Sequence, residues 1–102
     1  MDVETIRSGI SPILKSHHAK KAILFGSYAR STEDNRSDID LIIVDDEELP
    51  CLERLEKYFK DLTDVLAMSV DLFVYRSREF EEMKEGPFVG RAIAEGVTLY
   101  ER

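Results

Sequence analysis

Apolar positions recur along the chain with two different spacings, which predict an alternation of helices and strands. A stripe with the period of an α-helix opens the chain: Val3, Ile6, Ile10, Ile13 and Leu14. Pro12 falls inside this stripe, so we expect the helix either to kink there or to restart with Ser11 as its N-cap. Residues 22–25 then form a short, continuously apolar run that is typical of a buried strand.

The later apolar runs predict three more strands and three more helices. The strands are expected at 38–44, at 70–75 and, as an edge strand, at 97–101. A helix of about four turns follows the second strand, and its inner face is expected to carry Leu52, Leu55, Phe59, Leu62 and Leu66. A helical turn is expected at 28–31, and short helices are expected around 80–83 and over 88–95, where Gly86-Pro87 and Gly96 stop them. The order predicts an α/β or α+β protein, in which helices flank a small mixed sheet.

Length and composition fit this picture. The 102 residues suit a single domain over 1–102, and 43% hydrophobic residues suffice for a core. One cysteine, Cys51, excludes an internal disulfide, and no apolar run approaches the ~20 residues that span a bilayer. With an N-terminus unlike a signal peptide, we expect a cytoplasmic protein without membrane contact. The net charge of −7 disfavours direct binding to nucleic acid.

Several polar residues outside the apolar runs are interpreted as structural or solvated. His17 and His18 lie in a polar connector without partners at metal-ligand spacing, so both are expected in solvent. The acidic run 45–48 is expected to be a solvated loop, Tyr58 to be structural, and Cys51 to start or pack a helix.

Two aspartates interrupt the second predicted strand. Asp38 and Asp40 are two residues apart, so on a strand they project from one face, while Ile39 and Leu41 turn to the other. Adjacent carboxylates repel each other unless a cation lies between them, and Mg²⁺ prefers oxygen ligands. The pair therefore predicts a magnesium site.

Asp71 is a third candidate ligand, because it stands among apolar residues of the next strand. An unpaired carboxylate is disfavoured there, so either the strand is at an edge with Asp71 in water or Asp71 faces a charged ligand. Three carboxylates could hold two metal ions about 3.5–4 Å apart, as in enzymes of phosphoryl transfer.

Gly26-Ser27 ends the first predicted strand and supplies donors for an anion. Glycine lets the backbone approach a phosphate closely, and the amides of a strand-to-helix turn point outward. Taken singly, Gly26-Ser27 could be only a turn, and Asp38 could cap a strand entry. Arg30 and Arg36 could equally pair with surface acids or bind phosphate.

The pattern G-S-x10-D-x-D, followed by a later strand aspartate, resembles the polymerase-β-type nucleotidyltransferase superfamily. More narrowly, the whole chain resembles the minimal nucleotidyltransferases (MNT), the antitoxins of HEPN/MNT toxin–antitoxin pairs, and its ending GPFVGRAIAEGVTLYER looks like their last helix and strand. The resemblance implies a polymerase-β-like fold and an enzyme that transfers AMP from Mg-ATP to a hydroxyl.

The resemblance also implies a role for each matching residue. Gly26 and Ser27 would bind the β- and γ-phosphates, and Arg30 could touch phosphate. The two aspartates of the D-x-D motif, Asp38 and Asp40, would hold two Mg²⁺ ions. Asp71 would share one ion and help to deprotonate the acceptor. Ser31, the position after Arg30, departs from the glycine that many relatives have there.

For the minimal family the implied acceptor is a tyrosine of a partner HEPN ribonuclease toxin, which adenylylation would neutralise. Two alternatives stay open: an antitoxin that neutralises its toxin by binding alone, and a small-molecule nucleotidyltransferase of the aminoglycoside type. The sequence leaves homo- or hetero-oligomerisation open.

Overall fold

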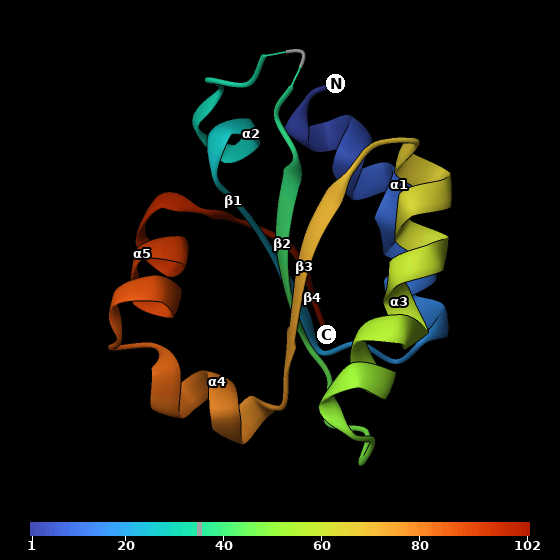
Figure 1. Cartoon of the computed structure of the whole chain (residues 1–102), viewed down its shortest axis with the longest axis vertical. Helices are drawn as coiled ribbons and strands as arrows, with labels where there is room; N and C mark the ends of the chain where they lie inside the picture. The colour runs from blue at the N-terminus through green and yellow to red at the C-terminus, as the bar shows by residue number, and fades with distance from the viewer. Residues whose placement is uncertain (35) are drawn as a thin grey trace.

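The computed structural model describes residues 1–34 and 36–102, and their centre is a mixed four-stranded sheet (Figure 1). The strands, in their order across the sheet, are β3 (Val70–Tyr75), β2 (Ile39–Val44), β1 (Lys21–Phe25) and β4 (Val97–Glu101). β1 is antiparallel to both of its neighbours, whereas β3 runs parallel to β2. The predicted α+β class, the mixed sheet and the edge position of the C-terminal strand are confirmed.

Helices cover both faces of the sheet (Figure 1). α1 (Val3–Ser16) and α3 (Cys51–Leu66) lie on one face, and α4 (Ser77–Met83) and α5 (Pro87–Glu95) lie on the other. The short helix α2 (Ser27–Arg30) follows β1 directly. Within the described part of the chain, no helix combines the length and the apolar character that crossing a membrane requires.

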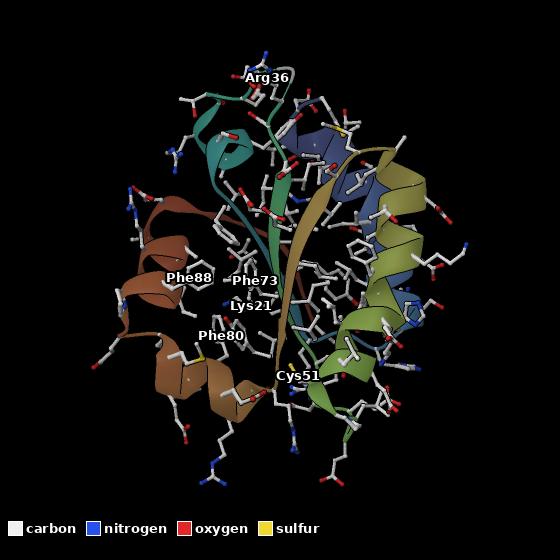
Figure 2. All side chains as sticks on the ribbon, viewed as in Figure 1. Lys21, Arg36, Cys51, Phe73, Phe80 and Phe88 are labelled. Carbon is white, nitrogen blue, oxygen red and sulfur yellow. The ribbon has the colours of Figure 1, made fainter. Side chains whose placement is uncertain are left out.

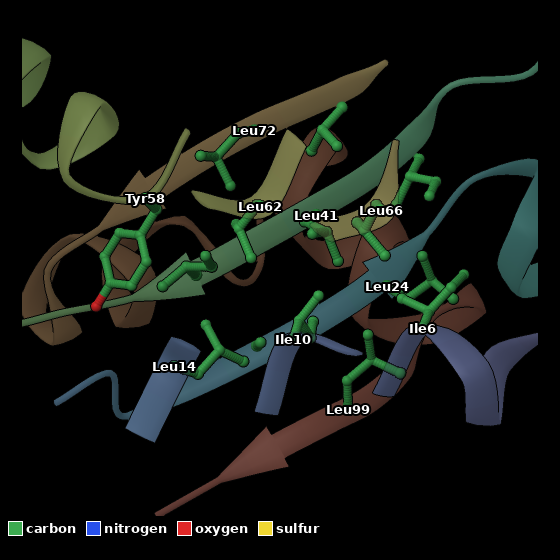
Figure 3. Close-up of a cluster of buried hydrophobic side chains, with 14 of the residues drawn as sticks. Ile6, Ile10, Leu14, Leu24, Leu41, Tyr58, Leu62, Leu66, Leu72 and Leu99 are labelled. Carbon is green, nitrogen blue, oxygen red and sulfur yellow. The ribbon is translucent and has the colours of Figure 1, made fainter. Parts of the chain in front are cut away.

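The larger core lies between the sheet and the α1/α3 layer (Figure 3). Its labelled side chains in Figure 3 come from both helices and all four strands: Ile6, Ile10, Leu14, Leu24, Leu41, Tyr58, Leu62, Leu66, Leu72 and Leu99. Ile39, Leu41 and Ile43 of β2 turn into this core, as predicted, while Ile42 and Val44 join a smaller cluster on the α4/α5 side. Asp40 therefore belongs to the α4/α5 face.

The first helix is continuous through its proline. Asp2 caps it, with Oδ1 accepting from the Thr5 N–H at 2.8 Å, and the helix continues past Pro12 to Ser16. The hydroxyl of Ser11 donates to the Arg7 carbonyl one turn earlier, at 2.6 Å, so Ser11 is inside the helix and caps nothing. The expected restart at Ser11 is wrong, because the buried stripe of Ile6, Ile10 and Leu14 remains on one face across the proline.

The inner face of α3 differs from the predicted one. Its buried residues are spaced four apart: Arg54, Tyr58, Leu62 and Leu66. Leu52 and Phe59, which were expected inside, are 64% and 44% exposed. Apolar counting failed here because the polar side chains of Arg54 and Tyr58 have hydrogen-bond partners on other elements and can be buried in place of leucine and phenylalanine.

Asp45 is one of those partners, although the run 45–48 was expected to be solvated. Its side chain is buried and accepts from Lys57 Nζ at 2.8 Å, from the Glu47 N–H at 2.8 Å and from the Tyr58 hydroxyl. Burial alone would raise the pKa of Asp45, but these donors outweigh burial and lower it. The expectation is wrong for Asp45, which ties the end of β2 to α3.

His17 also belongs to this end of the core. Its Nε2 lies 3.1 Å from Asp61 Oδ2, and its ring meets the edge of Tyr58 at a centroid distance of 5.2 Å. His17 is therefore packed against α3 rather than solvated, as had been expected. Cys51 is the exposed first residue of α3, which agrees with its predicted role at a helix start.

The substitution Tyr58→Phe tests the buried cluster. Loss of the hydroxyl leaves Asp45 with one donor fewer in the interior, so we expect the free energy of unfolding to fall by about 1–3 kcal/mol. Tyr100→Phe removes a hydroxyl that has no hydrogen-bond partner among the described residues, and is expected to change stability by less than about 0.5 kcal/mol. Urea unfolding of both variants measures the difference, and equal losses would contradict the role of Tyr58.

Candidate active site

Asp40 is at the centre of the predicted site, on the second position of the central strand β2. In the sheet register it lies opposite Phe25, the last residue of β1, and beside Asp71, the second residue of β3. The ends of three strands therefore bring Asp40 and Asp71 to the same edge of the α4/α5 face. Asp71 is exposed on an edge strand, so its carboxylate is in contact with water. The same residue is also the direct neighbour of Asp40 in the sheet.

Asp38 lies just before the strand instead of on it, since β2 begins at Ile39, one residue later than predicted. The backbone N–H of Ile39 donates to the Ser69 carbonyl at 3.0 Å, which fixes the start of β2 against the start of β3. Asp38 is half-buried, and its charge acts on Asp40. The predicted trio of aspartates is thus gathered in one region.

The pKa of Asp40 is raised both by burial and by the negative charges that lie close to it. Burial, then the charge and hydrogen-bonding contact of Asp71, then the charge of Asp38 raise the pKa of Asp40 to about 6, while Arg30 opposes the shift. Within residues 1–34 and 36–102, however, no group of three acidic, histidine or cysteine side chains stands close enough together to hold a metal ion. The three carboxylates are close enough for their charges to repel, but they are not grouped closely enough to coordinate a single ion.

Gly26 fits directly against Asp40. Its φ of +75° lies in the region that favours glycine, and it connects β1 to α2 as the helix N-cap. A Cβ built on Gly26 would lie 2.1 Å from Asp40 Oδ2 and 3.0 Å from its Cγ. Both the backbone conformation and the neighbouring carboxylate therefore require glycine here.

The turn after Gly26 carries the other predicted phosphate ligands. Ser27 begins α2, and its carbonyl accepts from the Thr32 N–H at 2.9 Å, which closes the turn. Arg30 ends α2, with Nη1 3.6 Å from Glu95 Oε2, so this guanidinium reaches the last turn of α5. Ser31 has a φ of 58°, a left-handed conformation that explains why glycine suits this position.

An aromatic cavity of about 510 Å³ opens beside Gly26 and Arg30, between β1 and α5. Phe25 and Phe88 line it, and their rings meet edge to face at a centroid distance of 5.5 Å. The ring centroid of Phe73, on β3, lies 4.9 Å from that of Phe88 (Figure 2). The aromatic cluster therefore extends to the strand that carries Asp71. Arg91 and Glu95 complete the polar part of the cavity wall.

Sequence reasoning missed these cavity residues. Phe88 and Arg91 are about sixty residues from Gly26 along the chain, and α5 approaches β1 only through the fold. The one available signal was Phe25 directly before the glycine turn, an aromatic residue at the mouth of a predicted anion site.

Comparison with known proteins decides the family. The family model described as polymerase beta, nucleotidyltransferase, matches residues 8–102. This chain belongs to that family. The resemblance to the polymerase-β-type superfamily, drawn from the G-S and D-x-D residues, is thereby confirmed, and the chain is a nucleotidyltransferase.

Curated relatives carry a more specific name. A protein of Methanocaldococcus jannaschii, provisionally named a protein adenylyltransferase, is 36% identical over 77 residues, which span 76% of this nucleotidyltransferase and 82% of the relative. A second such protein from the same organism is 32% identical over 94 residues, or 90% of this chain and 87% of the relative.

Solved structures share the fold. A toxin–antitoxin complex with AMP-PNP matches with a TM-score of 0.70 and 24% identity, over 94% of this nucleotidyltransferase and 73% of that chain. A minimal nucleotidyltransferase matches with a TM-score of 0.69 and 24% identity, over 95% of both chains. A complex of a tri-AMPylated HEPN toxin from Shewanella oneidensis with its MNT antitoxin gives 0.65 and 22%, over 98% and 73%. The predicted polymerase-β-like fold is confirmed.

Gly26→Ala tests the contact between the glycine turn and Asp40. The added methyl group must displace the carboxylate and strain the backbone, so we expect a loss of about 1–3 kcal/mol in the free energy of unfolding. Gly9→Ala, a substitution within α1, is the matched control, because a Cβ added at Gly9 meets its nearest atoms only at 3.9 Å. The control should be neutral or stabilising by up to about 1 kcal/mol. Thermal unfolding of both variants is the measurement.

Asp40→Asn tests the crowding of charge through pH. Because the pKa of Asp40 is raised from 3.8 to about 6, stability is lost as the pH rises through this range; the cost is complete above about pH 6 and vanishes below about pH 3, where Asp40 is protonated in both the folded and the unfolded state. With EDTA present, Asp40→Asn should therefore be more stable than the wild type by about 1–2 kcal/mol at about pH 8, and should lose this advantage below about pH 3. Glu56→Gln, an exposed carboxylate on α3, should show no such pH-dependent gain.

Proposed function

We propose that this nucleotidyltransferase transfers AMP from Mg-ATP to a tyrosine hydroxyl of a partner HEPN ribonuclease toxin and thereby neutralises the toxin. The observation that carries the proposal is the direct fit of Gly26 against Asp40. A turn suited to phosphate and a carboxylate suited to metal are held side by side at the end of adjacent strands.

The donor set suits magnesium. Asp38, Asp40 and Asp71 present only carboxylate oxygens, and the pKa of Asp40 is raised by burial and by the neighbouring charges of Asp71 and Asp38, a cost to its ionised form that a bound cation would relieve. We assign these three residues as the ligands of the Mg²⁺ ions. When bound, the ions supply charge neutralisation and orientation of the triphosphate.

Residues of the chain itself would bind and orient the nucleotide. The amides of the turn at Gly26 and Ser27 suit the β- and γ-phosphates, and Arg30 at the cavity wall adds a guanidinium. The aromatic cavity next to Gly26 suits the adenosine, since Phe25 and Phe88 offer ring faces for stacking.

In the reaction, the tyrosine oxygen forms a bond to the α-phosphorus while the bond from that phosphorus to the bridging oxygen breaks. Pyrophosphate leaves with the electron pair of that bond, and the hydroxyl proton passes to a carboxylate, for which exposed Asp71 is the proposed acceptor. Attack and departure are in line on opposite sides of phosphorus.

The partner is inferred from the relatives. Curated relatives are named protein adenylyltransferases, and structural neighbours come from toxin–antitoxin complexes, one of them a tri-AMPylated HEPN toxin with its MNT antitoxin. A non-catalytic antitoxin and an aminoglycoside-type enzyme are the alternative outcomes of the experiment below.

Incubation with α-labelled ATP, Mg²⁺ and a HEPN ribonuclease toxin of the proposed partner class is expected to label the toxin. Asp40→Asn and Asp71→Asn should each lower the transfer rate by about a thousandfold or more, because each removes a carboxylate that would hold the Mg²⁺ whose positive charge stabilises the transition state, and EDTA should abolish transfer. Asp61→Asn, a substitution on the outer side of α3, should transfer AMP as the wild type does.

The same mixture separates the alternatives. Protection from the toxin by Asp40→Asn, with an unchanged complex, would show neutralisation by binding alone. Transfer of AMP to an added aminoglycoside instead of the toxin would show a small-molecule enzyme.

A further inference from the structure

A second hollow lies on the other side of the carboxylates from the aromatic cavity. This groove, about 650 Å³ in volume, is lined by Asp38 and Asp71 together with Phe59, Thr63, Met68 and Ser69, and we name it the β3-edge groove. The turn from α3 into β3 forms one wall, at the same end of the molecule as α2 (Figure 1). The aromatic cavity adjoins β1 and the groove adjoins β3, so Asp40 on β2 stands between them.

We propose that the β3-edge groove binds the acceptor as an extended, tyrosine-bearing segment of the partner protein that carries lysine or arginine beside the tyrosine. The proposal rests on the proposed function, because it gives the acceptor of that reaction its place. It also assigns Phe59 of α3 as the residue that positions the acceptor.

The geometry of transfer favours this groove. Nucleophile and leaving group lie on opposite sides of the reacting phosphorus. With the β- and γ-phosphates at Gly26 and Ser27 on the β1 side, pyrophosphate leaves toward β1. The acceptor must therefore arrive from the β3 side, where the groove brings Asp38 and Asp71 to its wall.

The walls of the groove suit an aromatic side chain that ends in a hydroxyl. Phe59 is 44% exposed, so its ring is available for contact. Thr63, whose hydroxyl donates to the Phe59 carbonyl at 2.9 Å, also lines the groove, and Met68 adds a thioether. Apolar walls that lead to two carboxylates match a phenol ring that leads to its hydroxyl.

The backbone of β3 offers a second means of recognition. β3 is an edge strand that pairs with β2 alone among the described strands, so its outer side can pair with an added strand. An extended segment beside β3 would bring a side chain next to Asp71.

Charge selects the class of segment. The charged side chains that line the groove are Asp38 and Asp71, and the whole chain has a net charge of −7. Basic residues near the tyrosine would be attracted, whereas acidic residues or the phosphates of RNA would be repelled.

The test uses short synthetic peptides with one central tyrosine, flanked by leucine and either lysine or glutamate. We expect the wild type to transfer labelled AMP to the lysine peptide with kcat/KM at least about tenfold above that for the glutamate peptide. Phe59→Ser removes the ring without adding charge and should raise the KM for the lysine peptide about tenfold, with the KM for ATP unchanged. Leu52→Ser is the matched control, an exposed apolar residue on the same helix that does not line the groove, and should behave as the wild type.

A binding measurement separates positioning from chemistry. Fluorescence anisotropy with a labelled lysine peptide whose tyrosine is replaced by phenylalanine should show about tenfold weaker binding to Phe59→Ser and a smaller loss for Phe59→Leu, which keeps an apolar side chain. Thermal unfolding verifies that both variants are folded, as expected for an exposed position.

Three results would overturn the groove: wild-type kinetics and binding in Phe59→Ser, an equal loss in Leu52→Ser, or labelling of an RNA 3′-hydroxyl in place of the peptides. Labelling of the intact toxin that is insensitive to Phe59→Ser would overturn the groove but leave the proposed function intact. A wild type that labels neither toxin nor peptide would instead refute the proposed function, and the groove with it.

Discussion

The candidate site depends on one close contact, between a glycine without a Cβ and a carboxylate on the neighbouring strand. Antiparallel pairing of β1 and β2 sets Phe25, the last residue of β1, opposite Asp40. Gly26, which follows the strand, therefore turns away directly over that carboxylate. Any side chain larger than hydrogen at Gly26 would occupy the position of Asp40 Oδ2. The distance between phosphate turn and carboxylate is thus a consequence of strand pairing, and it does not depend on flexible loops.

The cost of gathering carboxylates at one edge is offset by the opposite face of the same strands. Ile39, Leu41 and Ile43 alternate with Asp40 along β2 and are fully buried against α1 and α3. The cluster around Asp45 reinforces this layer at the far end of β2. The α1/α3 face therefore holds the sheet together, and the α4/α5 face is free to expose Asp71 and Phe73 for chemistry.

Predictions that depend on interactions between residues near in sequence were mostly correct, and the main errors arose from contacts between distant elements. Strands, most helix positions and the inward turn of Leu41 were correct because they depend on periodicity over a few residues. The inner face of α3 was wrong because Arg54 and Tyr58 are buried by partners on other elements: Arg54 Nη1 donates to Glu79 Oε1 at 2.7 Å, and Tyr58 donates to Asp45. Hydrophobicity alone cannot reveal such pairs.

The sequence by itself determined the family of the chain and the order of the elements. Gly26, Asp40 and Asp71 were recognisable as candidates because a glycine and two carboxylates interrupt runs of apolar residues. Only the tertiary structure decided that α5 closes an aromatic cavity beside Gly26 and that α3 walls a groove beside Asp71. The physical reason is distance along the chain, since both hollows join residues whose proximity results from sheet order and helix packing and leaves no mark on local periodicity.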